Sequence, residues 1–282
     1  MKILSFGEML FDGYENNYVI GGAAFNFATH IVASGDEDYV YTTVGNDKLG
    51  KKALEIADKF HVNKKYLSMS DQYPTGVSNI VLDKDGVPTF DLVRNVGYDH
   101  IKYIPLEEKF DAISFVSLAL RDESEDSLDT LKKLLANNKF KHIYCDPNLR
   151  APYIKDKIVR FCLETPDIIK LNEDEVAYIR DNIINEKLDN ESFAKRLNEL
   201  YPNIKLVLMT FGPNGSIVYY QNKFYKCPSV KTEVVSTVGA GDSFGATFLS
   251  SFLHGEDIDT CLKKASIRSA FVVSRKEATP DI

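Results

Sequence analysis

The sequence has 282 residues, of which 44% are hydrophobic, and its formal net charge is −7 at pH 7. A chain of this length can bury a large core, and we expect one α/β domain over residues 1–282. The acidic balance argues against binding to nucleic acid or to anionic membranes, because neither surface attracts an acidic protein. Apolar stretches stay below the roughly 20 residues that span a bilayer. We therefore expect a cytoplasmic protein with reduced cysteines.

Short apolar runs alternate with helical patterns along most of the chain. Buried strands are expected at residues 2–6, 39–44, 112–116, 142–145, 167–171 and 205–209, and helices near 24–34, 48–60, 124–138, 173–180 and 192–200. This alternation predicts a mostly parallel sheet with helices on both faces. A hairpin with strands at 216–220 and 223–227 is expected to end the sheet.

Extended segments at 14–19, 76–82 and 87–93 interrupt this alternation. We expect them to form a small antiparallel β lid, from about residues 13–20 and 73–95. Because a sheet of so few strands is not stable alone, its apolar face is expected to pack against the lid of a second chain in a homodimer. The alternative is that the lid folds onto its own body. The residues expected on that face are Tyr73, Val77, Ile80, Phe90 and Leu92.

The N-terminal region places a carboxylate and an amide near an expected strand end. Asp12 follows the run at 2–6, and open α/β sheets bind ligands beyond their strand ends. Asn26 lies in a Gly-rich entry into a helix that also contains Gly22. Together they suit a polyhydroxylated substrate, because they offer several acceptors and two donors. Equally, Asp12 before Gly13 is an ordinary turn signal, and Asn26 can be a satisfied helix residue.

The central region offers a possible phosphate and metal site. Asn172 and Glu175 are three residues apart at an expected helix start, where Glu175 could hold hydrated magnesium. The same spacing is close to a capping box, which needs no ligand. Thr210 ends another apolar run and precedes the Gly-rich loop from Gly212 to Gly215, and it could contact a nucleotide phosphate or ribose. A plain hairpin turn explains that loop equally well.

The segment at 236–243 combines two glycines, a helix start and a carboxylate. Gly239 and Gly241 allow tight turns whose N–H groups can converge on one anion at the positive end of the next helix. Asp242 would lie beside that anion and could accept a proton from a substrate hydroxyl. The alternative is a Gly-rich turn with an Asp cap.

Taken in order, these segments resemble the ribokinase-like (PfkB) carbohydrate kinase family from end to end. The stretch at 21–26 resembles the family's N-terminal signature and that at 238–244 its C-terminal signature. The resemblance implies a three-layer α/β/α sandwich and an enzyme that uses ATP and Mg²⁺ to phosphorylate a sugar hydroxyl. It makes Asp242 the general base and the amides of Gly239, Ala240 and Gly241 the anion hole. It also implies sugar contacts from Asp12, Gly22 and Asn26, and a nucleotide side formed by Asn172, Thr210, Gly212 and the neighbouring Gly215.

Three positions depart from the family pattern. Ser236 stands where members commonly carry an Asp that helps to ligate an activating monovalent cation, and Glu277 stands where Gly is usual in the loop beside that cation. We therefore doubt activation by potassium. Ser266 stands where Asn is often found near the adenine, so contacts with the base are expected to rest on apolar packing.

The segments at 7–12 and 93–101 look more like fructokinases than ribokinases or adenosine kinases, so we expect fructose as the substrate. Arg94, at the end of the second lid segment, could reach that substrate or could be a solvated arginine. Ribose, another ketose and a nucleoside stay open as acceptors, as does a catalytically inert sugar-binding regulator. A nucleotide-binding dehydrogenase is excluded, because Gly21-Gly22 does not match the Gly-x-Gly-x-x-Gly fingerprint.

Overall fold

The computed structural model describes residues 1–14, 17–82, 88–122 and 124–280. Within these residues, the larger sheet has nine strands in the order β13-β12-β11-β10-β9-β8-β1-β4-β5. The seven strands β11, β10, β9, β8, β1, β4 and β5 are parallel to one another. At one edge, β12 is antiparallel to β11 and β13 is antiparallel to β12. The strands are β1 (Lys2–Phe6), β4 (Glu37–Gly45), β5 (Leu67–Ser70), β8 (Ala112–Phe115), β9 (His142–Cys145), β10 (Ile168–Asn172), β11 (Leu206–Thr210), β12 (Ser216–Tyr220) and β13 (Lys223–Cys227).

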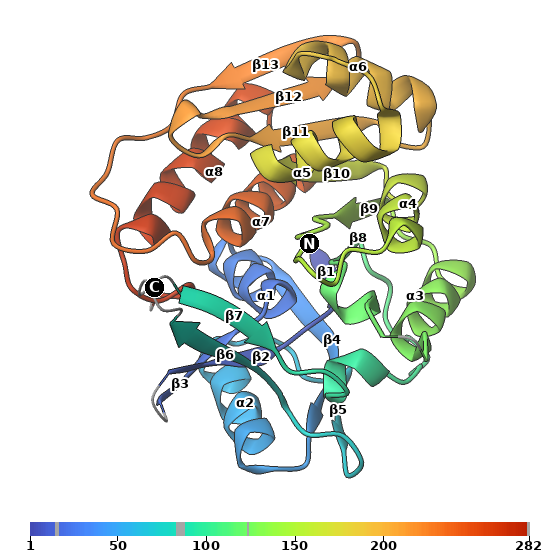
Figure 1. The fold of residues 1–282 in the computed structure, drawn as a ribbon, viewed down its shortest axis with the longest axis vertical. Coiled ribbons are helices and arrows are strands. Elements are labelled where there is room, and N and C mark those ends of the chain that lie inside the picture. The colour runs from blue at the N-terminus through green and yellow to red at the C-terminus, as the bar shows by residue number, and fades with distance from the viewer. Residues whose placement is uncertain (15–16, 83–87, 123, 281–282) are drawn as a thin grey trace.

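Helices cover both faces of this sheet, which confirms the predicted three-layer architecture (Figure 1). On β11, Leu206 and Leu208 pack toward α1, α7 and α8, whereas Val207 and Met209 pack toward α4, α5 and α6. Alternate residues of a strand face opposite sides, so a strand buried on both faces is apolar throughout. The helices are α1 (Ala23–Ala33), α2 (Lys48–Lys59), α3 (Asp126–Asn137), α4 (Asp156–Glu164), α5 (Glu173–Tyr178), α6 (Asn190–Leu200), α7 (Ala240–Leu253) and α8 (Ile258–Val273).

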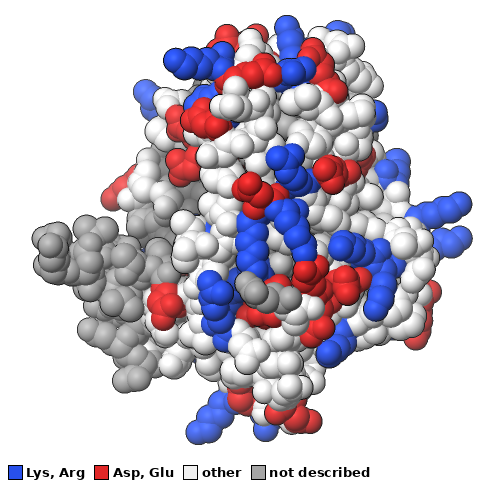
Figure 2. Space-filling view, turned by 45° about the vertical axis from the view of Figure 1, so that its right-hand side comes forward, with Lys and Arg blue, Asp and Glu red and all other residues white. Residues whose placement is uncertain are grey.

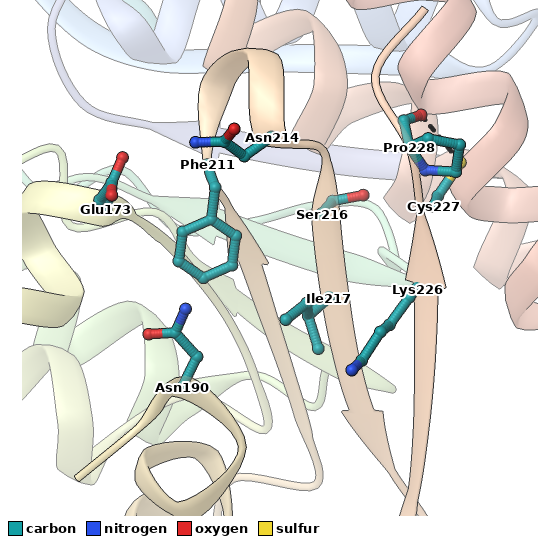
Figure 3. Close-up of a pocket in the computed structure, with 9 residues that line it drawn as sticks. All are labelled: Glu173, Asn190, Phe211, Asn214, Ser216, Ile217, Lys226, Cys227 and Pro228. Atoms are coloured by element: carbon teal, nitrogen blue, oxygen red, sulfur yellow. Dashed lines mark hydrogen bonds between the residues drawn. The ribbon is translucent and has the colours of Figure 1, made fainter.

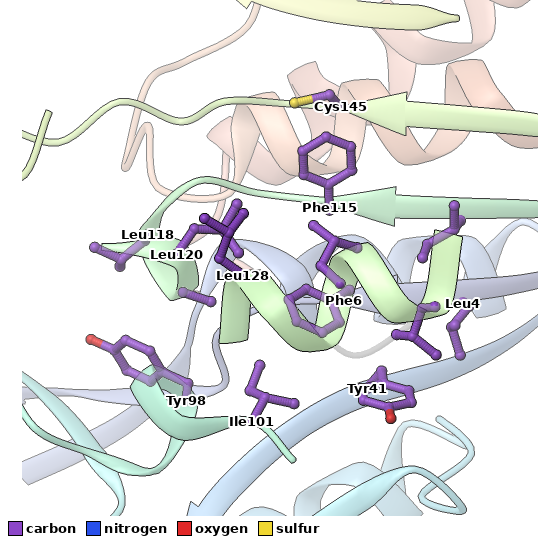
Figure 4. Packing of buried hydrophobic residues seen from close by; sticks show 14 of the residues in the cluster. Leu4, Phe6, Tyr41, Tyr98, Ile101, Phe115, Leu118, Leu120, Leu128 and Cys145 are labelled. Atoms are coloured by element: carbon purple, nitrogen blue, oxygen red, sulfur yellow. The ribbon is translucent and has the colours of Figure 1, made fainter. Parts of the chain in front are cut away.

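The predicted strands of the larger sheet are confirmed to within two residues at each end, including the edge hairpin. The sequence reading missed β5, α4 and α8. Aromatic and aliphatic residues from β1, β8 and α3 fill one part of the core, where Phe6, Phe115 and Leu128 belong to the same cluster (Figure 4). This core fixes the sheet edge from which the ligand-binding loops emerge.

The predicted lid is a second sheet with the strand order β3-β2-β6-β7. Its strands are β2 (Leu10–Tyr14), β3 (Asn17–Gly21), β6 (Gly76–Leu82) and β7 (Pro88–Leu92). The pairs β2–β3 and β6–β7 are antiparallel, as expected, but β2 and β6 are parallel. The lid also begins earlier than predicted, so Asp12 lies within lid strand β2 and not beyond the end of β1. The chain leaves β1 at Gly7, where a Cβ would lie 2.5 Å from Val116 and 2.9 Å from Ala24.

A buried arginine joins the end of lid strand β7 to the turn at Gly97–His100. The guanidinium of Arg121 donates from Nε to Asp99 Oδ1 at 2.9 Å and also donates to the carbonyls of Leu92 and Val93. Leu92 is buried in the main core of its own chain, so the prediction that it packs against the lid of a second chain is wrong. The side chains of Ile80 and Phe90, expected on the same face, lie outside what the structure describes.

Within the described residues, no helix has the length and apolar character that crossing a membrane requires. Lysine and arginine side chains are interspersed with aspartate and glutamate on the described part of the face in Figure 2. That face therefore lacks a broad area of one sign, such as a nucleic-acid backbone would need.

Candidate active site

The predicted anion-binding turn lies at the start of α7. Gly239 is the residue before the helix and has a φ of 78°, a left-handed conformation that favours glycine. The N–H groups of the first helical turn have no acceptor within the helix and face its open end. Of these, the Ala240 amide already donates to the Thr237 carbonyl at 3.3 Å, so it would have to leave that bond to hold an anion.

Asp242 lies in the first turn of α7, half-buried, where a ligand can reach it. The side-chain amide of Asn26 donates from Nδ2 to Asp242 Oδ2 at 2.8 Å, across 216 residues of sequence. Burial raises the pKa of Asp242 to about 6, and the charge of Asp146 adds to this rise. A carboxylate with a pKa near neutrality is suited to accept a proton. The two signature segments therefore meet at a poised carboxyl group, and Asn26 holds that group in place.

A buried ion pair lies directly beneath this turn and was missed in the sequence. Lys170 of β10 donates from Nζ to Asp146 Oδ2 at 2.7 Å, and both side chains are nearly inaccessible. A Cβ on Gly241 would lie 3.0 Å from Lys170 Nζ, so glycine lets the turn rest on the ammonium group. Although burial alone would lower the pKa of Lys170, Asp146 and Glu175 raise it. In the sequence, the ion pair was indicated by one feature: Lys170 is a single basic residue inside an apolar strand.

Asn172 and Glu175 form the capping box that was the alternative to a ligand site. Asn172 Oδ1 accepts from the Glu175 amide at 2.9 Å, and Glu175 Oε2 accepts from the Asn172 amide at 2.8 Å. Glu175 Oε1 also accepts from the Leu149 amide at 2.9 Å. Burial, followed by the charge of Asp146, raises the pKa of Glu175 to about 7. Glu175 therefore ties the segment at 146–150 to the start of α5.

No group of three or more His, Cys, Asp or Glu residues within the described chain could hold a metal ion. Both Glu175 oxygens already accept from amides, and the residue is 2% exposed. A divalent cation at this site would therefore be held chiefly by nucleotide phosphates and water, which is the usual arrangement for Mg²⁺.

The side of the site that was expected to bind sugar contains a second buried carboxyl group, Glu8, which was not among the predicted site residues. Glu8 Oε1 accepts from the Ala23 amide at 3.1 Å, and Glu8 Oε2 has no hydrogen-bond partner among the described residues. Burial raises the pKa of Glu8 to about 7. Gly22 has a φ of 101°, and a Cβ there would lie 2.5 Å from the Glu8 carbonyl. The tight packing at Gly22 therefore keeps Glu8 at the start of α1.

Asp12 and Arg150 complete the polar lining of this side. Burial raises the pKa of Asp12, and hydrogen bonding to Ser78 and the positive charge of Arg150 partly offset this effect. The charge of exposed Arg150 also lowers the pKa of Glu8 and of Asp242, against the larger effect of burial. Arg94 is exposed as well, and its guanidinium lies 4.8 Å from the centre of the Tyr153 ring.

The expected nucleotide-side residues are placed less uniformly. Thr210 ends β11, and Gly212 has a φ of 52° with no described atom within 4 Å of where a Cβ would lie. Gly215 packs against β13, where a Cβ would lie 2.2 Å from the Cys227 carbonyl. Ser266 is buried and its hydroxyl lies 3.5 Å from Cys227 Sγ, and its place beside the adenine stays a prediction. The neighbouring Ile267 is 61% exposed and offers an apolar surface.

A cavity of about 300 Å³ lies next to the loop at 212–215 (Figure 3). Its lining includes Glu173 of α5, Asn190 of α6, Phe211 and Ile217. Ile217 packs with the α5 and α6 side of the sheet, whereas its neighbour Val218 packs with α7. Cys227, which also lines the cavity, packs with the α7 and α8 side, so the cavity takes lining residues from both faces of the sheet.

The description "pfkB family carbohydrate kinase" fits this chain over residues 3–282. An ATP-dependent 6-phosphofructokinase from Thermoanaerobacterium thermosaccharolyticum is 29% identical over 300 residues, covering 96% of this chain and 86% of that protein. A probable chloroplastic fructokinase-6 from Arabidopsis thaliana is 27% identical over 297 residues, covering 96% of this chain and 74% of that protein.

Solved structures show the same fold. A fructokinase from Vibrio cholerae O395, solved with fructose, ADP and a calcium ion, matches with a TM-score of 0.82 at 20% identity, covering 99% of this chain and 94% of that one. The family match extends over both signature segments and over the four lid strands. The chain therefore belongs to the PfkB family and is an ATP-dependent carbohydrate kinase similar to the fructokinases.

Proposed function

We propose that the protein transfers the γ-phosphoryl group of ATP to a primary hydroxyl of fructose. The observation that carries this proposal is the hydrogen bond from Asn26 to Asp242 at the start of α7. This bond connects α1, where the sugar contacts are proposed, to the anion-binding turn through the carboxyl group of Asp242. Fructokinases among the relatives and solved structures support the choice of sugar.

In the proposed reaction, Asp242 accepts the proton of the attacking hydroxyl as its oxygen bonds to the γ-phosphorus. The bond between that phosphorus and the β–γ bridging oxygen breaks, and ADP leaves with the electron pair. The free amides of the first turn of α7 would hold the negative charge on the transferred group, and the helix dipole acts in the same sense. Lys170 beneath Gly241 adds a positive charge to the same region.

The sugar contacts are proposed to come from Asp12, Glu8, Gly22 and Asn26, with Arg94 or Arg150 at the rim. Thr210, Gly212, Gly215 and Asn172 are proposed to lie along the nucleotide, whose base would pack on Ile267. Mg²⁺, held by the phosphates and water, would neutralise charge on the nucleotide. The hydroxyl of Ser236 accepts from the Val238 amide at 3.3 Å, and Glu277 is exposed to solvent. We therefore propose that no monovalent cation is required.

A coupled assay of ADP release, run with a panel of acceptors, tests the proposal. The panel contains fructose, ribose, another ketose, a nucleoside and fructose 6-phosphate, each with MgATP and with K⁺ or Na⁺. We expect the highest kcat/KM with fructose and less than about twofold difference between the two salts, since a cation used in catalysis is worth more than that. A preference for another acceptor would change the substrate, and no turnover with any acceptor would favour an inert sugar-binding regulator.

We also propose that two chains associate through the lid. Tyr18 and Val19 of β3 are 38% and 52% exposed, which leaves apolar surface on an outer strand of this sheet. Light scattering after size exclusion should give twice the 31.8 kDa chain mass. The variant Val19→Lys should shift this toward the monomer, because it places a charge in the proposed contact. A monomeric wild-type protein would contradict the proposal.

A further inference from the structure

Two side chains of helix α1, one turn apart, contact Asp242 and the segment behind the anion-binding turn. Asn26 donates to Asp242 at 2.8 Å. His30, four residues later and therefore on the same helical face, lies 3.0 Å from the Ala278 carbonyl through its Nε2. His30 is fully buried. The same helix thus reaches both the carboxyl group and the segment behind the anion-binding turn.

The contact between Ala278 and that turn is close. A Cβ added to Gly239 would lie 2.7 Å from the Ala278 Cβ and 2.8 Å from the Ala278 carbonyl oxygen. Gly239 holds the left-handed conformation that starts α7. Because Ala278 fills the space behind Gly239, the position of its carbonyl limits where the backbone of the turn can lie. A shift of Ala278 would therefore move the amides that face the ligand.

Arg268 of α8 determines which nitrogen of His30 carries the proton. Arg268 lies 3.2 Å from His30 Nδ1 through Nε and 3.0 Å through Nη2. A guanidinium can only donate, so Nδ1 must accept and Nε2 must carry the hydrogen that is donated to Ala278. Burial and the Arg268 charge lower the pKa of His30 to about 4. His30 is therefore neutral at neutral pH and acts as a fixed donor.

We propose that His30 and Arg268 are a positioning pair that sets the anion-binding turn through Ala278. Arg268 orients the imidazole, the imidazole holds the Ala278 carbonyl, and Ala278 supports Gly239. Neither side chain needs to touch a substrate. The proposal rests on the proposed function, because the turn is taken to be the phosphoryl site. It adds that two residues outside both signature segments set its geometry.

The variant His30→Leu tests the pair, since leucine retains apolar bulk and removes both hydrogen bonds. We expect kcat to fall at least about tenfold while the KM for the sugar stays within about twofold, as displacement of a transition-state contact requires. Amide hydrogen exchange in residues 238–244 should become faster, and this readout needs no substrate. His30→Gln carries one donor and one acceptor and should recover most of the lost kcat.

Two further variants make the test decisive. His254→Leu is the matched control, because His254 pairs with Asp36 at the other end of α7 and should leave kcat unchanged. Arg268→Leu should reproduce the loss of kcat, and it decides the question if His30→Leu does not fold. Full kcat and unchanged exchange at 238–244 in a folded His30→Leu or Arg268→Leu protein would overturn the pair. Absence of sugar phosphorylation by the wild-type protein would instead overturn the proposed function, and the exchange data would still report on the pair.

Discussion

Replacing Asp242 with asparagine is expected to lower kcat by at least about a hundredfold and to leave the KM for the sugar within about twofold. Asparagine has nearly the same shape and can still contact Asn26, so binding should persist. It cannot accept the hydroxyl proton, so the step that breaks the phosphate bond loses its base. Steady-state kinetics with the preferred acceptor measure both constants.

The pH dependence gives a second readout of the same residue. Burial and then Asp146 raise the pKa of Asp242 to about 6, so the base becomes protonated as the pH falls through that value. Wild-type kcat/KM should therefore fall below about pH 6, and the residual activity of Asp242→Asn should not show that limb. Asp181→Asn is a suitable control, because Asp181 is exposed and pairs with its sequence neighbour Arg180. A loss of less than tenfold, or an unchanged acid limb, would contradict the assignment.

The anion-binding turn could be predicted from the sequence because its parts are contiguous. Gly239, Gly241 and Asp242 lie within one helical turn, where spacing alone determines that they share a helix start. The capping box of Asn172 and Glu175 is local in the same way, and here the ligand-free alternative described the hydrogen bonds correctly. Most strands and helices were equally accessible, since periodicity reports burial, although β5, α4 and α8 were missed.

Contacts between distant segments could not be predicted from spacing. Asn26 was assigned to the sugar, and only the packing of α1 on α7 brings it to Asp242. Asp12 was placed at a sheet edge because nothing in the sequence shows that the chain turns out at Gly7 to form β2. Ser266 faces β13, whereas the next residue of its helix, Ile267, is exposed. A shift of one residue along a helix thus decides whether a side chain is buried or exposed.

Buried charged residues were the other feature that was not predicted from the sequence. Glu8 and Lys170 each stand alone in an apolar segment, where sequence analysis treats a single charge as an interruption of the core pattern. In the structure both lie beside the proposed reaction centre, and Lys170 has a dedicated partner in Asp146. A lone charge inside an apolar segment at a ligand-binding edge is therefore a useful signal, since a buried charge is costly and groups with a shifted pKa cluster at functional sites.

Lys170→Met is expected to have the second large effect, first on stability. Methionine matches the apolar stem of lysine but leaves Asp146 buried and unpaired next to Asp242 and Glu175. Breaking a buried pair by removing one partner typically costs about 3–5 kcal/mol of unfolding free energy. Chemical denaturation at neutral pH should show a loss of this size. Lys264→Met, which removes an exposed pair with Glu256, should cost less than about 1 kcal/mol.

Lys170→Met should also raise the pKa of the proposed base, Asp242. After burial and Asp146, which raise the pKa of Asp242, the charges of Lys170 and Arg150 lower it. Removing Lys170 should therefore move the acid limb of kcat/KM to higher pH, so that activity at pH 7 falls more than activity at pH 8. The double variant Lys170→Met/Asp146→Asn removes both charges, and it should recover most of the stability and return the limb toward its original position.

Turnover separates an electrostatic role of Lys170 from a merely structural one. If its ammonium stabilises charge at the anion-binding turn, the double variant should remain at least about tenfold slower than wild type even at its optimal pH, because the positive charge beneath Gly241 is still missing. If the pair serves only to hold β9 and β10 together, the stable double variant should recover full kcat. Wild-type turnover in that protein would show that the turn and the helix dipole stabilise the transferred phosphoryl group without Lys170.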